Sequence, residues 1–420
     1  MVLDSADIER AVCARLLGGT VRLTPRVVAA ARQHRVHLLL AASLSCHERA
    51  EPEAAELSRE LRTAAALDAS GERDLRELLE ALAADGVDVL LLKGVGLAHT
   101  VYSAPHVRPR VDTDFLVRRE MIEQAERVFA AAGWTRPTER EVELSAAQRH
   151  YTKTGPAGTL QHLDVHWRIA NPQRFANALS FDEMRSRAID IPALGHHART
   201  LGLADALFLA CVHRVAHHGD EIQLLWLWDV HLLIQRLSQP DRERFLWLAE
   251  REAMGAVCWR SVELGYQYFA TTGAPELAVA LRERAEGRRE RPARFMSNSR
   301  LVNVLISDLE TLPGWRARAS LIAEHVFPSR AYMHSIYPAW PAVLLSFAYG
   351  YRIIRGAPKW FARRSSEGTK SPATAHLVVQ ERTCALRTMT NASGNRRSAS
   401  TDNPTASASS CSSPGANEWW

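Results

Sequence analysis

The chain has 420 residues, of which 46% are hydrophobic and 24% are charged, and its 52 basic and 47 acidic residues give a formal net charge of +5. These proportions are ordinary for soluble globular proteins and exclude both a largely disordered chain and a membrane-embedded one. The small basic excess is spread along the sequence, which argues against nucleic acid as a partner.

Cysteine usage and the N-terminus bear on the compartment. The six cysteines lie far apart and form no C-x-x-C pair, which argues against a zinc knuckle and against a disulfide framework. The N-terminus lacks the basic and apolar regions of a signal peptide. No apolar run approaches the roughly 18–20 residues of a spanning helix. We therefore expect a cytoplasmic protein without membrane insertion.

The first part of the chain has helical periodicity. Residues 1–69 are expected to form an N-terminal helical segment, and a later helical pattern, with leucines at positions 75, 78, 79 and 82, ends at Asp85 and Gly86. The next residues, 87–94 (VDVLLLKG), form a short apolar run bounded by turn residues, which is typical of a buried strand. A helix over residues 95–102 should follow.

Two further strands are expected. Residues 111–117 (VDTDFLV) form one apolar run, and residues 160–167 (LQHLDVHW) alternate between polar and apolar side chains. A helix over residues 120–132 lies between them, and the stretch after it is expected to be irregular. Together these elements predict an α+β fold, with a small mixed β-sheet core over residues 70–195.

The remaining chain divides by composition. Residues 196–364 carry strong helical stripes, such as LADALFLACVHRVAHH, with prolines between them, and predict a helical domain. Residues 365–420 are rich in Ser, Thr, Asn and Ala with few large apolar groups. Such a segment buries too little apolar surface to offset its ordering entropy, so we expect a disordered tail.

Acidic residues on two predicted strands suggest a metal site. Asp112 and Asp114 are two positions apart, so their side chains leave the same face of the strand, with alpha carbons about 7 Å apart. Such a pair in an apolar strand needs compensating charge, and divalent metal is the compensation that we favour. Asp164 on the third strand would complete the site. Alternatively, one aspartate pairs with Arg108 or Arg110 and the other is solvated.

A glycine-containing turn precedes these acids. The run LLKGVG places Gly94 and Gly96 after the first strand and before a helix, where backbone N–H groups and a helix N-terminus can bind phosphate. Lys93 would add a positive charge. Alternatively, this is a plain strand-to-helix turn that needs glycine for its backbone. The run lacks the G-K-[ST] ending of a P-loop.

This combination resembles the DNA polymerase β-like nucleotidyltransferases, which have an apolar strand ending in glycine, D-x-D on the next strand and a later single acid between apolar residues. More narrowly, it is similar to a bacterial family of uncharacterised nucleotidyltransferases typified by L-K-G, an alanine-rich helix with tyrosine, and R-x-x-x-D-x-D. The similarity covers about residues 25–355. Its residues are Leu92, Lys93, Gly94, Leu97, Ala98, Tyr102, Pro105, Arg108, Asp112, Asp114, Leu163, Asp164, His166, Trp167, His213, His217, Trp226 and Asp229.

The resemblance implies a mechanism. Asp112 and Asp114 would bind two Mg²⁺ or Mn²⁺ ions, and Asp164 would join the second ion and activate an acceptor oxygen. That oxygen would attack the α-phosphate of a nucleoside triphosphate such as ATP, and pyrophosphate would leave. The wider superfamily has Ser where this chain has Val95, so phosphate contact must come from the backbone, Lys93 or elsewhere. The implied nucleotide-binding residues are Lys93, Gly94, Gly96 and Arg108.

Histidines in the helical half have two interpretations. His213 and His217 are four apart on one helical face, but H-R-V-A-H lacks the glutamate of the zinc protease motif H-E-x-x-H. They are either packed histidines hydrogen-bonded to Asp229 or, with His166 and Asp229, the lining of an acceptor pocket.

The sequence therefore predicts an enzyme that moves a nucleoside monophosphate from a triphosphate to an unidentified hydroxyl, with a small molecule or a peptide as the favoured acceptor. Three alternatives stay open. The first is a catalytically silent ligand-binding protein with the same fold, and the second is a protein-adenylylating enzyme like certain antitoxins. The third, an RNA-tailing enzyme, requires a basic groove.

Overall fold

The computed structural model describes residues 5–45, 47–137, 143–155, 158–286, 290–296, 300–338, 341 and 344–361. The expected disordered tail, residues 365–420, lies outside the described residues. The helices and strands belong to one compact unit, Met1–Lys153 with Gln161–Ser365, apart from the last residue of one strand and the first residue of the next. The domain boundaries expected from the sequence stay predictions. Within the described residues, no helix combines the length and the apolar character needed to cross a membrane.

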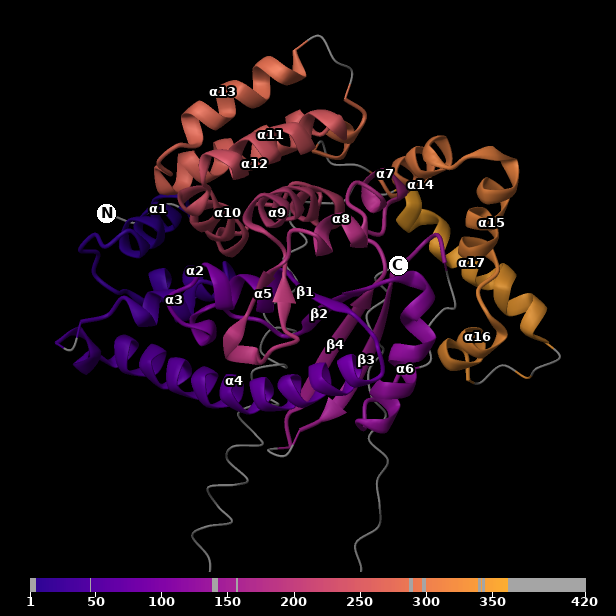
Figure 1. Cartoon of the computed structure of the whole chain (residues 1–420), viewed down its shortest axis with the longest axis horizontal. Helices are drawn as coiled ribbons and strands as arrows, with labels where there is room; N and C mark the ends of the chain where they lie inside the picture. The colour runs from indigo at the N-terminus through magenta and orange to yellow at the C-terminus, as the bar shows by residue number, and fades with distance from the viewer. Residues whose placement is uncertain are drawn as a thin grey trace, which may run out of the picture. The chain divides into compact units, whose positions relative to one another are not determined.

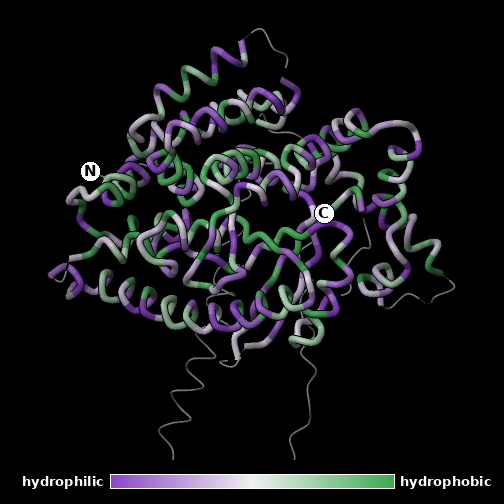
Figure 2. Tube along the Cα trace, in the orientation of Figure 1, coloured by the Kyte–Doolittle hydropathy of each residue, from purple (hydrophilic) through white to green (hydrophobic). Residues whose placement is uncertain are grey.

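The N-terminal segment is helical, as the sequence predicts. Thr24 caps α2 through its side chain, which accepts a hydrogen bond from Val27 N at 3.3 Å, and Pro25 occupies the first helical position. The long α4 ends at Ala84, where the predicted stop begins, and Figure 2 shows it alternating between hydrophilic and hydrophobic segments. The helices are α1 (Ser5–Leu16), α2 (Pro25–Gln33), α3 (His37–Ala42), the 3-10 turn η1 (Glu48–Ala50) and α4 (Pro52–Ala84).

A six-stranded mixed sheet forms the α/β core, in the order β3-β4-β2-β1-β6-β5 (Figure 1). β1 pairs antiparallel with β2 and parallel with β6, and β2 pairs parallel with β4. The three predicted strands are present, but the stretch expected to be irregular contains β3. The strands are β1 (Val89–Leu92), β2 (Thr113–Val117), β3 (Gln148–Thr154), β4 (Leu160–His166), β5 (Ile189–Asp190) and β6 (Arg199–Thr200).

Short helices connect the strands. The helix after β1 begins at once, with Lys93 as its first residue, and is followed by a 3-10 turn before β2. The connecting elements are α5 (Lys93–Thr100), η2 (Pro105–Val107), η3 (Arg119–Met121), α6 (Ile122–Ala131), α7 (Gln173–Ala176), α8 (Phe181–Arg185) and η4 (Pro192–Leu194).

The central strands are apolar because both of their faces are covered. Leu91 and Phe115 belong to a core cluster with α4 and α6. Leu92 and Leu116, one position on in each strand, belong to a different cluster with α5 and α9. Because side chains alternate across a strand, Asp114 lies on the same face as Leu116 and is directed toward α5 and α9.

The second half of the described chain is helical, as predicted. Several helices have proline in their first turn, including Pro240 and Pro275. Backbone N–H groups in the first turn make no hydrogen bond within the helix, so proline costs nothing there. The helices are α9 (Leu203–His218), α10 (Leu224–Arg236), α11 (Gln239–Arg251), α12 (Gly255–Phe269), α13 (Ala274–Ala285), η5 (Pro292–Met296), α14 (Leu301–Thr311), α15 (Gly314–Val326), α16 (Arg330–Ile336) and α17 (Leu345–Phe361).

The N-terminal helices pack on this helical half. Val28, Val36 and Leu40 share one buried cluster with Leu225 of α10 and Leu264 of α12. The packing brings the α2–α3 connection against α10.

Candidate active site

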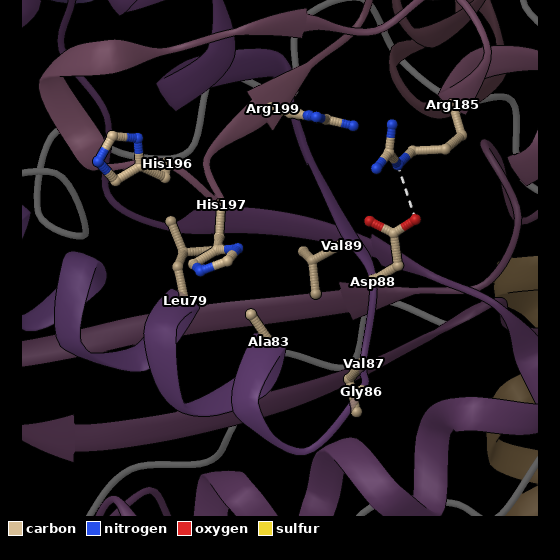
Figure 3. A pocket seen from close by; sticks show the side chains of 10 residues that line it. All are labelled: Leu79, Ala83, Gly86, Val87, Asp88, Val89, Arg185, His196, His197 and Arg199. Carbon is tan, nitrogen blue, oxygen red and sulfur yellow. Dashed lines mark hydrogen bonds and ion pairs between the residues drawn. The ribbon is translucent and has the colours of Figure 1, made fainter.

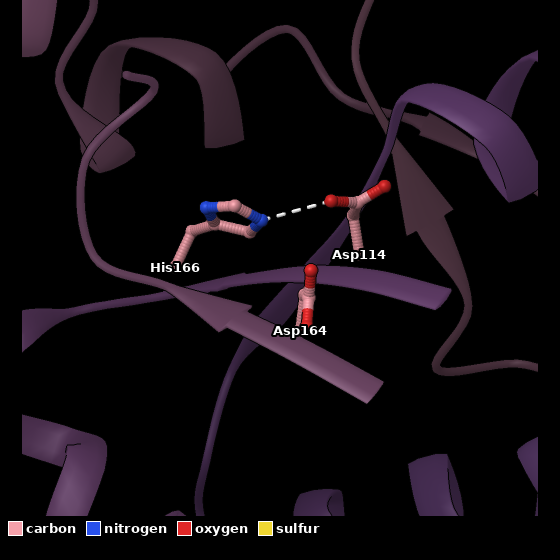
Figure 4. A group of neighbouring side chains, drawn as sticks. All are labelled: Asp114, Asp164 and His166. Carbon is pink, nitrogen blue, oxygen red and sulfur yellow. Dashed lines mark hydrogen bonds and ion pairs between the residues drawn. The ribbon is translucent and has the colours of Figure 1, made fainter. Parts of the chain in front are cut away.

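Two acids from different strands lie opposite each other in the sheet. In the parallel pair of β2 and β4, Asp114 is the register partner of Asp164. One ligand atom from each of Asp114, Asp164 and His166 lies within 4.8 Å of the others (Figure 4). Asp114 and His166 are buried, whereas Asp164 is half-buried. The strand register therefore assembles three groups that can hold one divalent cation.

Asp112 is part of the same electrostatic environment. The predicted strand begins at Val111, but β2 begins at Thr113, so Asp112 lies just before the strand and is half-buried. Burial and, after it, the negative charges of Asp114 and Asp164 raise the pKa of Asp112 to about 6. The three predicted acids thus interact with one another, although His166 rather than Asp112 completes the compact ligand cluster.

Lys93 is directed into the acidic cluster. Its Nζ donates to Asp114 Oδ1 at 3.0 Å, and its backbone φ of 44° lies in the left-handed region that disfavours side chains. Burial alone would raise the pKa of Asp114, but Lys93 and His166 outweigh burial and hold that pKa well below its usual range. A strained backbone at a residue that neutralises a buried carboxylate is typical of a functional site.

Histidines flank both acids of the register pair. His166 Nε2 lies 2.8 Å from Asp114 Oδ1, and His150 Nδ1 lies 2.7 Å from Asp164 Oδ1. His162 Nδ1 in turn lies 3.3 Å from His150 Nε2. Sequence reasoning missed His150 because it missed β3, although the run G-P-A-G before β4 is a turn signal that would have indicated a hairpin.

The two glycines lie in the first turn of α5 and are closely packed. A Cβ on Gly94 would stand 3.0 Å from Arg108 Nη1. A Cβ on Gly96 would collide with Thr200 Oγ1 and stand 3.1 Å from the Leu91 carbonyl oxygen. Neither glycine has a positive φ, so the alternative of a turn that needs glycine for its backbone dihedrals is wrong. Close packing gives a reason for glycine at both positions.

Arg108 binds an acid of the helical half. Its Nε donates to Asp229 Oδ1 at 2.9 Å and its Nη2 to Asp229 Oδ2 at 2.7 Å, and the Tyr102 hydroxyl donates to Asp229 Oδ1 at 2.5 Å. Arg110 pairs with Asp68. The alternative in which Arg108 or Arg110 pairs with an aspartate of the D-x-D motif is therefore wrong.

His213 and His217 lie side by side on α9, with ring centroids 4.9 Å apart. Among the described residues, His213 Nδ1 and His217 Nε2 are buried without a hydrogen-bond partner. Burial, followed by the charge of Lys93, lowers the pKa of both imidazoles well below the usual value. The packed interpretation required hydrogen bonds to Asp229, but that carboxylate is bound by Tyr102 and Arg108.

A pocket lies at the other end of β1 from Lys93 and the acids. Among its lining residues are Asp88, Arg185, His197 and Arg199 (Figure 3). Arg185 Nε is 2.6 Å from Asp88 Oδ2, so this cation already has a partner. The pocket contains none of the site residues predicted from the sequence.

The comparisons with known proteins identify the family of the chain. A family model described as "Uncharacterised nucleotidyltransferase" matches residues 23–269, a span that includes the three acids and Asp229 but ends before the expected residue 355. Among solved structures, the chain is similar to JHP933 from Helicobacter pylori, with 13% identity, a TM-score of 0.29, and coverage of 54% of this chain and 91% of that one. No curated protein matches the chain. Because the family model spans more than half of the 420 residues, the chain belongs to this family of uncharacterised nucleotidyltransferases.

Proposed function

We propose that this nucleotidyltransferase moves a nucleoside monophosphate from a nucleoside triphosphate to a hydroxyl acceptor, with Asp112, Asp114 and Asp164 as its catalytic acids. The observation that carries the proposal is the register pairing of Asp114 with Asp164, which brings two carboxylates and the His166 imidazole within 4.8 Å. Acids concentrated at one point of a sheet are expensive unless a cation joins them.

The donor set fits a divalent metal. Carboxylate oxygens suit Mg²⁺ and Mn²⁺, and an imidazole nitrogen at the same point suits Mn²⁺ better than Mg²⁺. Asp112 and Asp114 would hold two ions, and Asp164 would join the second of them. When bound, such ions neutralise charge on the triphosphate and on the attacking oxygen. Lys93, which already pairs with Asp114, would supply positive charge to the phosphates.

The proton of the acceptor hydroxyl needs a base. Asp164 is half-buried and its Oδ1 lies 2.7 Å from His150 Nδ1, which continues to His162 through a 3.3 Å contact. A carboxylate that is in contact with an imidazole chain can take up a proton from an attacking hydroxyl and pass it away from the reaction. Asp164 is therefore the proposed base, with His150 as the residue that positions it.

The acceptor would enter from α9. His213 and His217 lie close enough to Lys93 for its charge to affect them, and their depressed pKa values keep them neutral at neutral pH. A neutral imidazole with an unpartnered nitrogen accepts a hydrogen bond from a hydroxyl group. We include both residues, with His166 and Asp229, in the proposed acceptor pocket for a small molecule or a peptide.

The test is a labelling experiment. The protein is incubated with each α-phosphate-labelled triphosphate, Mg²⁺ or Mn²⁺, and a cell extract, and any labelled product is identified by mass spectrometry. Asp114→Asn should abolish labelling. Asp190→Asn, an exposed acid on β5 of the same sheet, is the matched control and should leave labelling intact.

Other outcomes point to the alternatives. Nucleotide with metal should raise the melting temperature of the wild type but not of Asp114→Asn. Indifference of the wild type to nucleotide would favour the silent ligand-binding protein. Labelled protein would indicate an adenylylating enzyme, and labelled RNA with steep salt dependence an RNA-tailing enzyme.

A further inference from the structure

An arginine occupies a position that normally belongs to glycine. Arg35 follows α2 with a φ of 57°, in the left-handed region. The turn is closed by Val36 N, which donates to Ala31 O at 2.8 Å, and by His34 N, which donates to Ala30 O at 2.9 Å. In this way of ending a helix the left-handed residue is usually Gly, because a Cβ is disfavoured there. The backbone of Arg35 is therefore held in a conformation that a residue with a side chain disfavours.

The turn is fixed against the helix that carries Asp229. The His34 carbonyl oxygen accepts a hydrogen bond from Leu225 N, 3.3 Å away at the start of α10, and the Gln33 carbonyl accepts one from Gln223 Nε2 at 3.3 Å. The helix that follows the turn, α3, packs against η2, and η2 immediately precedes Arg108. Figure 1 shows α2 and α3 between α4 and α10. Arg35 is thus held at the junction of the N-terminal helices, the acidic strand and α10.

Arg35 lies near Asp112 and Asp229 and has no protein partner of its own among the described residues. Its charge interacts with those of Asp112, Asp229 and Arg108. Among the described residues, no hydrogen bond or ion pair engages its guanidinium, whereas Arg108 is bound to Asp229 and Arg110 to Asp68. The side chain is only half-buried, so its donors can reach a ligand. A guanidinium that has no partner among the described residues, carried by a hydrogen-bonded turn beside the proposed catalytic acids, is suited to an anionic ligand.

We propose that Arg35 binds the β- and γ-phosphates of the triphosphate, which leave as pyrophosphate. This inference rests on the function proposed above. The acceptor oxygen forms a bond to the α-phosphorus, the bond from that phosphorus to the α,β-bridging oxygen breaks, and its electron pair stays on the pyrophosphate. The acceptor proton goes to Asp164. Arg35 contributes a planar fork of donors that matches phosphate oxygens and offsets the charge of the leaving group.

The assignment also supplies a phosphate contact that the side chain after Gly94 cannot make. That residue is Val95, whose side chain offers phosphate no hydroxyl. Arg35 supplies a phosphate-binding group from a different part of the chain. The N-terminal helices then form part of the active site.

The test uses a substitution that removes the guanidinium of Arg35 and, at the same time, relieves the strain of its left-handed backbone. Arg35→Gly should leave the melting temperature unchanged or higher, because glycine favours the left-handed conformation. By calorimetry, it should weaken binding of Mg²⁺-pyrophosphate and of Mg²⁺-triphosphates by about 10- to 100-fold, the usual effect of losing charge-assisted hydrogen bonds. Binding of nucleoside monophosphates should be unchanged, and Arg35→Lys should recover part of the loss.

Two control variants separate the change in backbone strain from the loss of an arginine charge. Ala253→Gly relieves a left-handed residue elsewhere, with a φ of 52°, and should not change pyrophosphate binding. Arg26→Ala removes an exposed arginine from α2 and should have no effect either. Equal pyrophosphate affinity in wild type and Arg35→Gly would overturn the assignment while leaving nucleotidyl transfer intact. Failure of the wild type to bind any triphosphate would overturn the proposed function and this inference together.

Discussion

Arg108 and Asp229 form a two-pronged ion pair, with Nε to Oδ1 at 2.9 Å and Nη2 to Oδ2 at 2.7 Å, and both residues are buried. Arg108 belongs to the connection that leads into β2, whereas Asp229 belongs to α10. The pair therefore ties the segment carrying Asp112 and Asp114 to the helical half. Tyr102 donates to the same carboxylate, so removing Asp229 leaves two buried donors without a partner.

We expect Asp229→Ala to lower the free energy of unfolding by about 3–5 kcal/mol, because breaking a buried pair leaves an uncompensated charge. Urea denaturation measures the change. The double variant Arg108→Met, Asp229→Leu should recover much of the loss, since apolar residues replace both charges. Asp182→Ala, which removes the 77%-exposed partner of Arg118, should cost about 0–1 kcal/mol. Comparable losses in Asp182→Ala and Asp229→Ala would contradict the argument.

His166 should be required for metal affinity. It contacts Asp114 Oδ1 at 2.8 Å and belongs to the ligand cluster, so His166→Gln should weaken Mn²⁺ binding by about 10- to 100-fold. Electron paramagnetic resonance of a Mn²⁺ titration gives the affinity. His334→Gln, an exposed histidine on α16, is the control. Unchanged Mn²⁺ affinity in His166→Gln would remove this residue from the metal site.

Gly96 should tolerate no side chain. An added Cβ would collide with Thr200 Oγ1, which itself donates to the Leu91 carbonyl at 2.7 Å, so neither atom can move cheaply. Gly96→Ala should therefore lower the free energy of unfolding by about 1–3 kcal/mol in chemical denaturation. Gly71→Ala, within α4, meets nothing within 4 Å and should stabilise the protein by about 0.5–1 kcal/mol. The same sign of effect in both variants would refute the packing argument.

Stability should fall in mild acid. Burial lowers the pKa of His231 to about 4, below its value in the unfolded chain of about 6.5. Between these values the unfolded state binds the proton and the folded state does not, so the free energy of unfolding falls as pH falls through this window. At pH 5 this residue accounts for a loss of about 2 kcal/mol. His231→Gln should flatten the pH dependence of stability by that amount, and an unchanged slope would count against the explanation.

The sequence identified the parts of the sheet that are apolar and central. The runs that became β1 and β2 are apolar and almost wholly buried, and the run that became β4 alternates between polar and apolar residues, so each carries a pattern that predicts a strand. β3 lies at the sheet edge, and its run QRHYTKT is mostly half-buried and polar, so hydrophobic periodicity had little to detect. β5 and β6 have two residues each, too few for any periodic signal.

The candidate site shows the same division. Asp114 and Asp164 lie on strands that the sequence pattern predicts, and Asp112 directly precedes one of them. Arg35 and His150 reach them through tertiary packing from segments whose local sequence signals no function. Arg35 stands out because its backbone is left-handed. A glycine usually marks such a position in a sequence, and the run RQHRVH contains none. Such residues become visible only when the N-terminal helices are placed against α10.

The opposition of Asp114 and Asp164 across β2 and β4 makes the site sensitive to a shift of a single residue. If β4 slid by one position, Leu163 or Val165 would face Asp114, and the Asp164 carboxylate would turn into the apolar layer on the reverse side. Misaligned sheets are therefore penalised by the same charges that form the candidate site. Once β2 and β4 pair in the correct register, Asp114 and Asp164 are already in position.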